Sequence, residues 1–593
     1  MRAGIRKFSV ALLWVLLGTS AALAAPANEP PRQLTERGME NLTAFTRLLG
    51  YVRFFHPSDQ AAAADWDRVA IAGVQEAEKA VNPADLARTL QDFFQPLAPT
   101  LRVFETGHAP PVPPELQPPG GNVEVIYWRH RGVELPGNTI STWLSRRDVT
   151  PSSLPPPGNP LEVSLGGGVS ALLPLTLYRD DGGTIPRVTL PAPSPDKPRG
   201  FKPSGNDRPT RLAGVALAWT VFQHFYPYFD VVTADWPAEL RRALSSAATD
   251  LNERAFVETL RRLMAALDDG HARVTHKSWV LNHQLPLVWA WIGEQLVITH
   301  ADPRQAPGLA HGDIVLTINN RPAEGVFAAE LALAPGATPQ QLRARALNMM
   351  LLGRKNEPVR LTVRKPDGAT RRVTVRRSVS IPLGPSGDFL TEPRPPKVAE
   401  VRPGIFYLDM NRIDDADFFA VFDRLASARG IVFDLRGYPW DLSLDPLAHF
   451  LSAAGRSSIF NAPLVLRPDR LGLEFVDRGW PFPPLAPLLP TRTVYITDGR
   501  AISYAETWLA IVEQYRMAGI VGEATAGTNG TINHVHLPGG YELRFTGLQT
   551  LRHDGSRFHG VGVQPTVPVS RTLAGIREGR DEFLEKAIET VSQ

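Results

Sequence analysis

Hydrophobic side chains recur along this chain with two different periods, and each period predicts its own kind of structural unit. Spacings of three and four over 86–94 and again over 256–267 are typical of amphipathic helices. Both stretches belong to a faint repeat, since Phe55-His56-Pro57 recurs as Phe225-Tyr226-Pro227 and an Ala-Asp-Trp triplet follows each at the same distance. We therefore predict a helical unit duplicated once, with chance similarity as the alternative.

Short apolar runs between turn residues predict strands in three further regions. A β-rich stretch separates the two helical copies, and a small β-domain with a hairpin turn at 365–368 follows the second copy. In the last region, short buried strands alternate with helical stretches, which indicates a sheet covered on both faces. The predicted multidomain α/β chain comprises a signal peptide (1–24), a helical unit (25–117), a β-rich segment (118–190), a Pro-rich linker (191–209), a second helical unit (210–284), a β-domain (285–378), a linker (379–403) and an α/β domain (404–593).

The first residues have the pattern of a secretory signal. Arg2, Arg6 and Lys7 precede an apolar run over 8–17, and Ala22-Leu23-Ala24 forms an A-x-A site. We expect cleavage after Ala24 and an exported protein, periplasmic or secreted, with an uncleaved anchor as the alternative. No later segment has the run of about 20 apolar residues that spans a bilayer, so no transmembrane segment is expected in the mature chain.

Charge and cysteine content narrow the function further. The chain has 63 Lys and Arg against 60 Asp and Glu, a net charge of +3, and the three basic residues of the signal account for that excess. A near-neutral mature chain gives no reason to expect nucleic acid or anionic lipid as a partner. The absence of cysteine from the sequence excludes disulfides, a Cys nucleophile and a thiolate metal site.

Ser503 lies where a predicted strand turns into a predicted helix. A Ser at such a turn is accessible, and the N-terminus of the helix favours negative charge beside it. The backbone N–H of Tyr504 would be placed to hold an oxyanion. The alternative is structural, because Ser503 and Glu506 also fit a capping box.

Five motifs in the last region together resemble the tail-specific (C-terminal processing) serine proteases, a family that includes the tricorn core protease and the interphotoreceptor retinoid-binding protein. The resemblance implies a ClpP/crotonase-like β–α superhelix, with Ser503 as nucleophile and the N–H groups of Gly437 and Tyr504 as the oxyanion hole. The motifs are G-I-F-Y-L (404–408), G-I-V-F-D-L-R-G (430–437), S-Y-A-E (503–506), G-I-V-G-E-A-T-A-G (519–527) and G-V-G-V-Q-P (560–565).

The family resemblance also suggests the base that activates Ser503. One branch uses a Lys about 25 residues after the Ser, but this chain has Gly-Thr-Asn-Gly at 527–530 and no Lys nearby. Another branch uses His in a D-x-H turn of a preceding domain, which matches Asp269-Gly270-His271. We expect His271 as general base, because imidazole titrates near neutrality. The alternative is a solvent-exposed His after a helix-stopping Gly.

The site departs from the tricorn pattern in two places, the first being Gly270, where tricorn has a Ser just before its His. Tricorn has a Glu before the Gly of its last motif, where this chain has His559. Asp268, Asp269 and Glu523 are therefore alternative orienting groups for His271, and His559 is either a supporting group or the base itself. Where the family has a Gly-rich turn, Tyr438 and Trp440 would narrow the site, form an apolar subsite or mark the loss of peptide-cleaving geometry.

The small β-domain resembles a bacterial PDZ domain, because 312–320 fits the strand pattern G-D-x-[IV]-x-x-[IV]-N-[GN]. Such domains bind a peptide as an added strand, so a protein or peptide substrate is the expected partner. The stretch 326–352 is longer than a minimal PDZ domain needs. An anonymous β-domain is the alternative.

Acyl transfer to water is the reaction that these motifs favour, and it needs no cofactor. A zinc site built on His534 and His536 with His553 or His559 is the metal-binding alternative, which we do not favour. The rival function is that of a non-catalytic binding protein for peptides or apolar ligands. The sequence leaves the oligomeric state, the substrate and the cleavage preference open.

Overall fold

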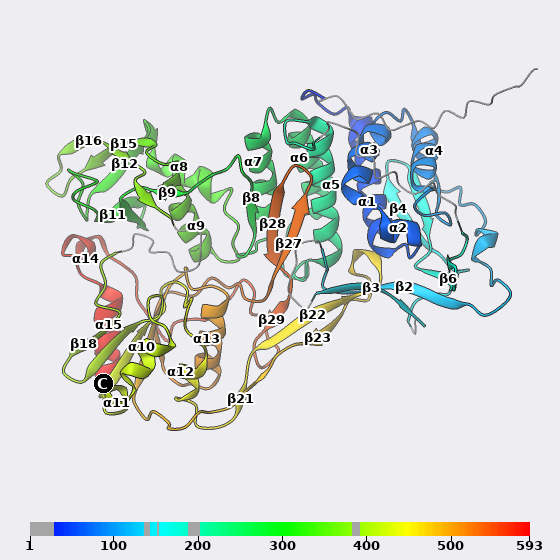
Figure 1. The fold of residues 1–593 in the computed structure, drawn as a ribbon. Coiled ribbons are helices and arrows are strands. Elements are labelled where there is room, and N and C mark those ends of the chain that lie inside the picture. Colours follow the sequence, from blue (N-terminus) through cyan, green and yellow to red (C-terminus); the bar gives the residue numbers. More distant parts are fainter. Residues whose placement is uncertain (1–28, 136–142, 151–152, 188–201, 382–391) are drawn as a thin grey trace, which may run out of the picture.

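The computed structural model describes residues 29–135, 143–150, 153–187, 202–381 and 392–593 (Figure 1). The predicted signal peptide and its cleavage site lie outside these residues. The described chain is a mixed α/β protein made of several packed units. Across the described ranges, every helix is too short or too polar to serve as a bilayer span.

Three helices of each copy correspond to one another, and the two sets share one hydrophobic core. The first copy also has a short additional helix, α2 (Asp59–Ala63). Asp65 and Asp235, the acidic residues of the repeated triplet, cap the second helix of each set through backbone N–H groups. The first helices of the two sets pack together, with the rings of Phe54 and Phe225 4.9 Å apart. The helices are α1 (Glu36–Phe55), α3 (Trp66–Glu78) and α4 (Pro83–Phe94) in the first copy, and α5 (Arg208–Phe225), α6 (Trp236–Thr249) and α7 (Glu253–Ala265) in the second.

The small β-domain is an antiparallel sheet in the order β10-β11-β12-β15-β16, with a hydrophobic core of its own. The long stretch within it folds into two helices, α8 (Ala323–Leu331) and α9 (Pro339–Leu351). Because α9 leads out of this domain towards the C-terminal part of the chain, it connects the two (Figure 1). The strands are β10 (Leu287–Ile292), β11 (Gln295–Ala301), β12 (Ile314–Ile318), β15 (Pro358–Arg364) and β16 (Thr370–Arg376).

A six-stranded sheet in the order β18-β19-β20-β25-β26-β30 forms the centre of the C-terminal region. Five of its strands are parallel, and β18 joins at the edge in the antiparallel sense. Helix α13 (Tyr504–Gln514) packs on one face against Phe433, and α15 (Glu582–Ser592) packs on the other against Val432. The strands are β18 (Val398–Arg402), β19 (Ile405–Asp409), β20 (Gly430–Asp434), β25 (Thr493–Thr497), β26 (Gly519–Gly522) and β30 (Val567–Pro568).

Strands from the C-terminal region also pair with strands of the preceding units. β22 (Ile459–Val465) pairs with β2 (Glu124–Arg131) of the β-rich segment. β28 (Tyr541–Thr546) pairs with β27 (Ile532–Leu537) on one side and with β8 (Arg273–Thr275) on the other. Since β8 directly follows the turn that carries His271, this last pairing holds the turn against the C-terminal region (Figure 1).

Candidate active site

Ser503 occupies a strained turn between β25 and α13. Its φ of +58° and ψ of −114° are unfavourable for a residue with a side chain, and surrounding contacts must hold such a conformation. The Ser503 N–H donates to the Thr528 carbonyl oxygen at 2.9 Å and to Glu506 Oε2 at 3.2 Å. The contact with Glu506 is one half of a capping box, and the strained turn is compatible with the nucleophile role of Ser503, which stays a prediction.

Glu506 ties the start of α13 to the loop at 525–528. Its fully buried carboxylate accepts hydrogen bonds from Thr525 Oγ1 at 2.5 Å, from the Gly527 N–H at 2.7 Å and from the Thr528 N–H at 2.9 Å. Burial raises the pKa of Glu506 to about 8, and the surrounding donors act in the opposite direction. The sequence motif indicated Glu506 only as a capping residue, whereas the structure makes it the centre of the loop that supports Ser503.

The turn that carries His271 meets the same loop. The Gly270 N–H donates to Thr528 Oγ1 at 3.0 Å, so Thr528 contacts the Ser503 turn with its backbone and the His271 turn with its side chain. From α9, Arg345 donates to the carbonyl oxygens of Gly270 and Ala272. The turns predicted to carry nucleophile and base are therefore joined through one residue, although 232 positions separate Ser503 from His271 in the sequence.

The His271 imidazole is 92% buried, which excludes the alternative of a solvent-exposed side chain. Its Nδ1 lies 2.8 Å from Thr546 Oγ1, and its Nε2 has no hydrogen-bond partner in the described part of the chain. Burial, with a smaller contribution from Arg345, lowers the pKa of His271 to about 3, so the ring is neutral. No hydrogen bond between described residues joins the Ser503 hydroxyl to this ring.

The two predicted oxyanion-hole donors lie beside Ser503 but have partners within the chain. The Gly437 N–H, in a residue with φ of +148°, donates to the Leu435 carbonyl oxygen at 3.0 Å. Burial raises the pKa of Tyr438, while hydrogen bonds from the Ser503 hydroxyl and the Tyr504 N–H to its phenolic oxygen lower it. The Tyr438 ring also packs against Trp440, with centroids 4.4 Å apart. Tyr438 thus brings a hydroxyl to the site, beyond the apolar wall that the sequence suggested.

Comparison with known proteins agrees with this geometry. Residues 482–569, which include the Ser503 turn and the 525–528 loop, match the model of peptidase family S41. This segment of the chain is therefore similar to peptidase family S41. The chain is accordingly a serine-type peptidase of the tail-specific, C-terminal processing type. None of the curated protein sequences matches this chain.

Solved structures extend the likeness beyond the S41 segment. Mature CPAF superposes with a TM-score of 0.51 at 14% identity, covering 65% of this chain and 97% of CPAF, which is a likeness of fold. A putative peptidase from Parabacteroides merdae gives a TM-score of 0.39 at 13% identity, covering 65% of this chain and 97% of that one. The photosystem II D1 C-terminal processing protease gives a TM-score of 0.37 at 16% identity, covering 64% of this chain and 96% of that protease.

The D-L-R motif at 434–436 anchors the turn that carries Gly437. Asp434 is fully buried, and Arg436 donates to it at 2.6 Å and to Asp581 at 2.7 Å. The charges of Arg436 and Arg394 hold the pKa of Asp434 far below its ordinary value, although burial alone would raise it. This buried ion cluster fixes the end of β20, from which the Gly437 turn projects.

The remaining predicted site residues have different surroundings. Asp269 is fully buried and contacts both the His271 backbone and Thr546, whereas no described interaction joins the Asp268 side chain to the imidazole. His559 contacts the Asp268 carbonyl oxygen through Nε2 at 2.9 Å and stacks on Tyr228 with centroids 3.9 Å apart. Burial lowers the pKa of His559 to about 4.

Glu523 and the histidines considered for zinc lie in other environments. Burial and the charge of Asp498 raise the pKa of Glu523, which faces that carboxylate and several arginines. His534 pairs with Glu542 at 3.0 Å, and His553 contacts the Arg456 carbonyl oxygen at 2.8 Å. Within the described ranges, no three His, Asp or Glu side chains gather in an arrangement that could hold a metal ion.

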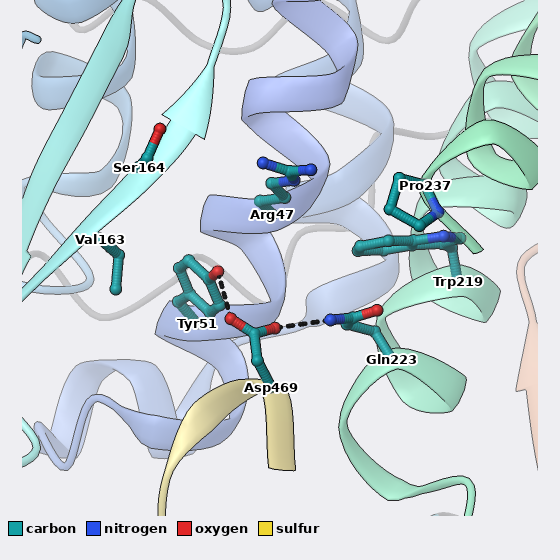
Figure 2. Close-up of a pocket in the computed structure, with 8 residues that line it drawn as sticks. All are labelled: Arg47, Tyr51, Val163, Ser164, Trp219, Gln223, Pro237 and Asp469. Atoms are coloured by element: carbon teal, nitrogen blue, oxygen red, sulfur yellow. Dashed lines mark hydrogen bonds between the residues drawn. The ribbon is translucent and has the colours of Figure 1, made fainter. Parts of the chain in front are cut away.

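A polar cavity of about 340 Å³ lies between the two helical copies, away from Ser503 (Figure 2). Asp469 enters it from the C-terminal region and is held by the Tyr51 hydroxyl at 2.7 Å and by the Gln223 side-chain amide at 2.8 Å. These two hydrogen bonds of Asp469 link α1 of the first copy to α5 of the second. The cavity is lined by Arg47, Tyr51, Val163, Ser164, Trp219, Gln223, Pro237 and Asp469.

Proposed function

We propose that the protein is an exported serine peptidase that hydrolyses peptide bonds through an acyl-enzyme on Ser503, with His271 as general base. The observation that carries this proposal is Thr528, which binds the backbone of both turns and so places them side by side. The neutral imidazole and the strained Ser503 turn agree with it. Export is inferred from the signal-like N-terminal pattern alone.

In the proposed reaction, the lone pair of His271 Nε2 takes the hydroxyl proton as Ser503 Oγ attacks the carbonyl carbon of the substrate. The backbone N–H groups of Gly437 and Tyr504 stabilise the resulting oxyanion. The C–N bond then breaks, the imidazolium returns its proton to the leaving amine, and an ester remains on Ser503. Water, activated by His271, hydrolyses this ester and releases the new carboxylate.

A bound substrate must displace the present hydrogen-bond partners of the Gly437 and Tyr504 N–H groups before the reaction can begin. The Gly437 N–H is bonded to Leu435, and Tyr438 lies against both Ser503 and the Tyr504 N–H. In our proposal, the carbonyl oxygen of a bound peptide takes the place of the Tyr438 hydroxyl. The resting arrangement would thereby limit the reaction of Ser503 in the absence of a substrate.

The PDZ-like domain would supply the peptide. An extended segment adds as a strand to an edge of its sheet, and α9 provides a rigid connection to the site. Thr338, the N-cap of α9, donates to the Ala526 carbonyl oxygen at 3.0 Å, and Gln340 donates to that of Thr525 at 2.7 Å. Binding on this domain therefore acts directly on the loop that supports Ser503.

A fluorophosphonate probe tests the proposal, because it reacts with activated serines. We expect labelling of the wild type, none in Ser503→Ala, a loss of at least about 100-fold in His271→Ala, and wild-type labelling in the control Ser427→Ala, whose side chain is exposed. An unlabelled wild type that still binds peptides would instead support a non-catalytic binding protein. The occupied N–H groups of Gly437 and Tyr504 are the observation that favours this second function.

A further inference from the structure

Thr546 and Asp269 form a buried hydrogen-bonded cluster with His271. One oxygen of the Asp269 carboxylate accepts the His271 backbone N–H at 2.8 Å and the Thr546 hydroxyl at 2.6 Å. The other oxygen accepts the Thr546 backbone N–H at 2.6 Å. Asp269 and Thr546 are both fully buried, so water does not compete for these bonds.

The proton positions in this cluster follow from the donors present. A hydroxyl has one hydrogen, and Thr546 donates its hydrogen to Asp269. The Thr546 oxygen, 2.8 Å from His271 Nδ1, must therefore accept a hydrogen from that nitrogen. The imidazole is neutral, so a proton on Nδ1 leaves the lone pair on Nε2, the nitrogen that the proposed reaction uses as base.

We infer that Thr546 is a positioning residue, which holds His271 in the Nδ1-protonated tautomer and transmits the charge of Asp269 to the ring. This inference rests on the proposed function and deepens it. In a Ser-His-Asp triad, a carboxylate that contacts the imidazole directly has this task. Here a threonine hydroxyl stands between the carboxylate and the ring. No additional proton moves: when Nε2 takes the Ser503 proton, Nδ1 keeps its own, and the imidazolium faces the Asp269 charge through Thr546.

The strand register explains why a residue so distant in sequence reaches His271. β8 and β28 are antiparallel, and Arg273 pairs with Arg544. Continuing the same register by two residues on each strand places Thr546 opposite His271. This pairing also supports the backbone of the turn, since Asp269 binds both ends of the contact.

The other candidates for an orienting group are engaged elsewhere. His559 directs Nε2 to the Asp268 carbonyl oxygen and stacks on Tyr228, and Glu523 faces Asp498. The charged or titratable groups around the His271 ring are Arg345, which lowers its pKa, His559, which interacts with it electrostatically, and Asp269, which is linked to it by the Thr546 hydroxyl. Of these, Asp269 alone supplies a negative charge, and it reaches the imidazole through the Thr546 hydroxyl.

A pair of variants at one position tests this inference. Thr546→Val keeps the shape but removes the hydroxyl, whereas Thr546→Ser keeps the hydroxyl and serves as the matched control. With a fluorophosphonate probe, we expect the maximal inactivation rate to fall about 100-fold or more in Thr546→Val while the half-saturating probe concentration stays unchanged. Thr546→Ser should stay within about threefold of the wild type, and thermal unfolding should verify that both variants fold.

The outcomes separate this inference from the proposed function. An unlabelled wild type overturns both. A labelled wild type that depends on His271, combined with a fully reactive Thr546→Val, overturns the role of Thr546 alone. If Thr546→Val does not fold, ¹⁵N-histidine NMR of the wild type decides: a protonated Nδ1 on His271 supports the inference, and a protonated Nε2 in the neutral ring overturns it.

Discussion

The substitution Gly270→Ala tests the packing that joins the His271 turn to the Ser503 turn. A Cβ atom at this position would lie 2.5 Å from Thr528 Oγ1 and 2.6 Å from Gln341 Oε1, well inside van der Waals contact. Both side chains are buried, at 0% and 3% exposure, so neither can swing into solvent. Each is also engaged, because Thr528 accepts from Gly270 and Gln341 accepts from the Ala337 N–H at 2.9 Å.

The magnitude of the effect follows from these contacts. Overpacking of a buried site costs about 1–3 kcal/mol, and each of the two hydrogen bonds that must lengthen contributes about 1 kcal/mol. We therefore expect Gly270→Ala to lower the free energy of unfolding by about 2–5 kcal/mol. Separating the turns by about 1 Å should also slow fluorophosphonate labelling of Ser503 by about 100-fold.

Urea denaturation and labelling rates measure both effects in the same preparations. Gly325→Ala is the matched control: Gly325 lies within α8, and an added Cβ would meet no atom within 4 Å. This control should be neutral or stabilising by up to about 1 kcal/mol, with an unchanged labelling rate. A Gly270→Ala protein as stable and as reactive as the wild type would refute the reasoning that Thr528 and Gln341 pack against the turn.

Three further predictions follow from the buried groups. Tyr438→Phe should increase the rate at which Ser503 is labelled about fivefold, because it removes one hydrogen bond worth about 1 kcal/mol. An unchanged rate would show that the phenol does not restrain Ser503. Glu506→Gln should lower the free energy of unfolding, measured with urea, by about 2–4 kcal/mol, because the new amide N–H₂ group would face a backbone N–H donor. Glu513→Gln, on the same helix, is the control. Burial lowers the pKa of five histidines to about 3 or 4, so the unfolded chain binds more protons and stability must fall as the pH drops from about 6.5 towards 4. Free energies of unfolding measured with urea at pH 7 and pH 5 should differ by up to about 2 kcal/mol per histidine, and equal values would contradict the burial of these side chains in the neutral form. The five are His56, His130, His224, His271 and His559.

Local patterns predicted the helical copies, the sheet with helices on both faces and the turns at Ser503 and His271. Each depends on residues close in sequence: a cap, an alternation of apolar side chains, or a short motif. The role of Thr546 could not be read in this way, because it results from the pairing of β28 with β8 across more than 250 positions. Thr528 was equally hidden, since its side chain meets Gly270 across 258 positions of the sequence.

The predicted domain boundaries illustrate the same limit. The predicted boundary at residue 404 falls between β18 and β19, which are paired strands of one sheet, so the predicted linker contains a strand of the domain that follows it. No local pattern, however, shows that β22 and β28 leave the central sheet and pair with β2 and β8 of earlier units. Strand partners are chosen by the assembled hydrophobic core, which a linear pattern does not contain.

The late position of β28 has a consequence for the timing of activity. During synthesis, the segment containing His271 is complete long before Ser503 is added, and the edge of β8 remains without its partner until residues 541–546 have followed. Neither the imidazole nor the serine turn can reach its final surroundings earlier. Under the proposed function, a growing chain therefore lacks the assembled site until more than nine-tenths of its 593 residues have been joined.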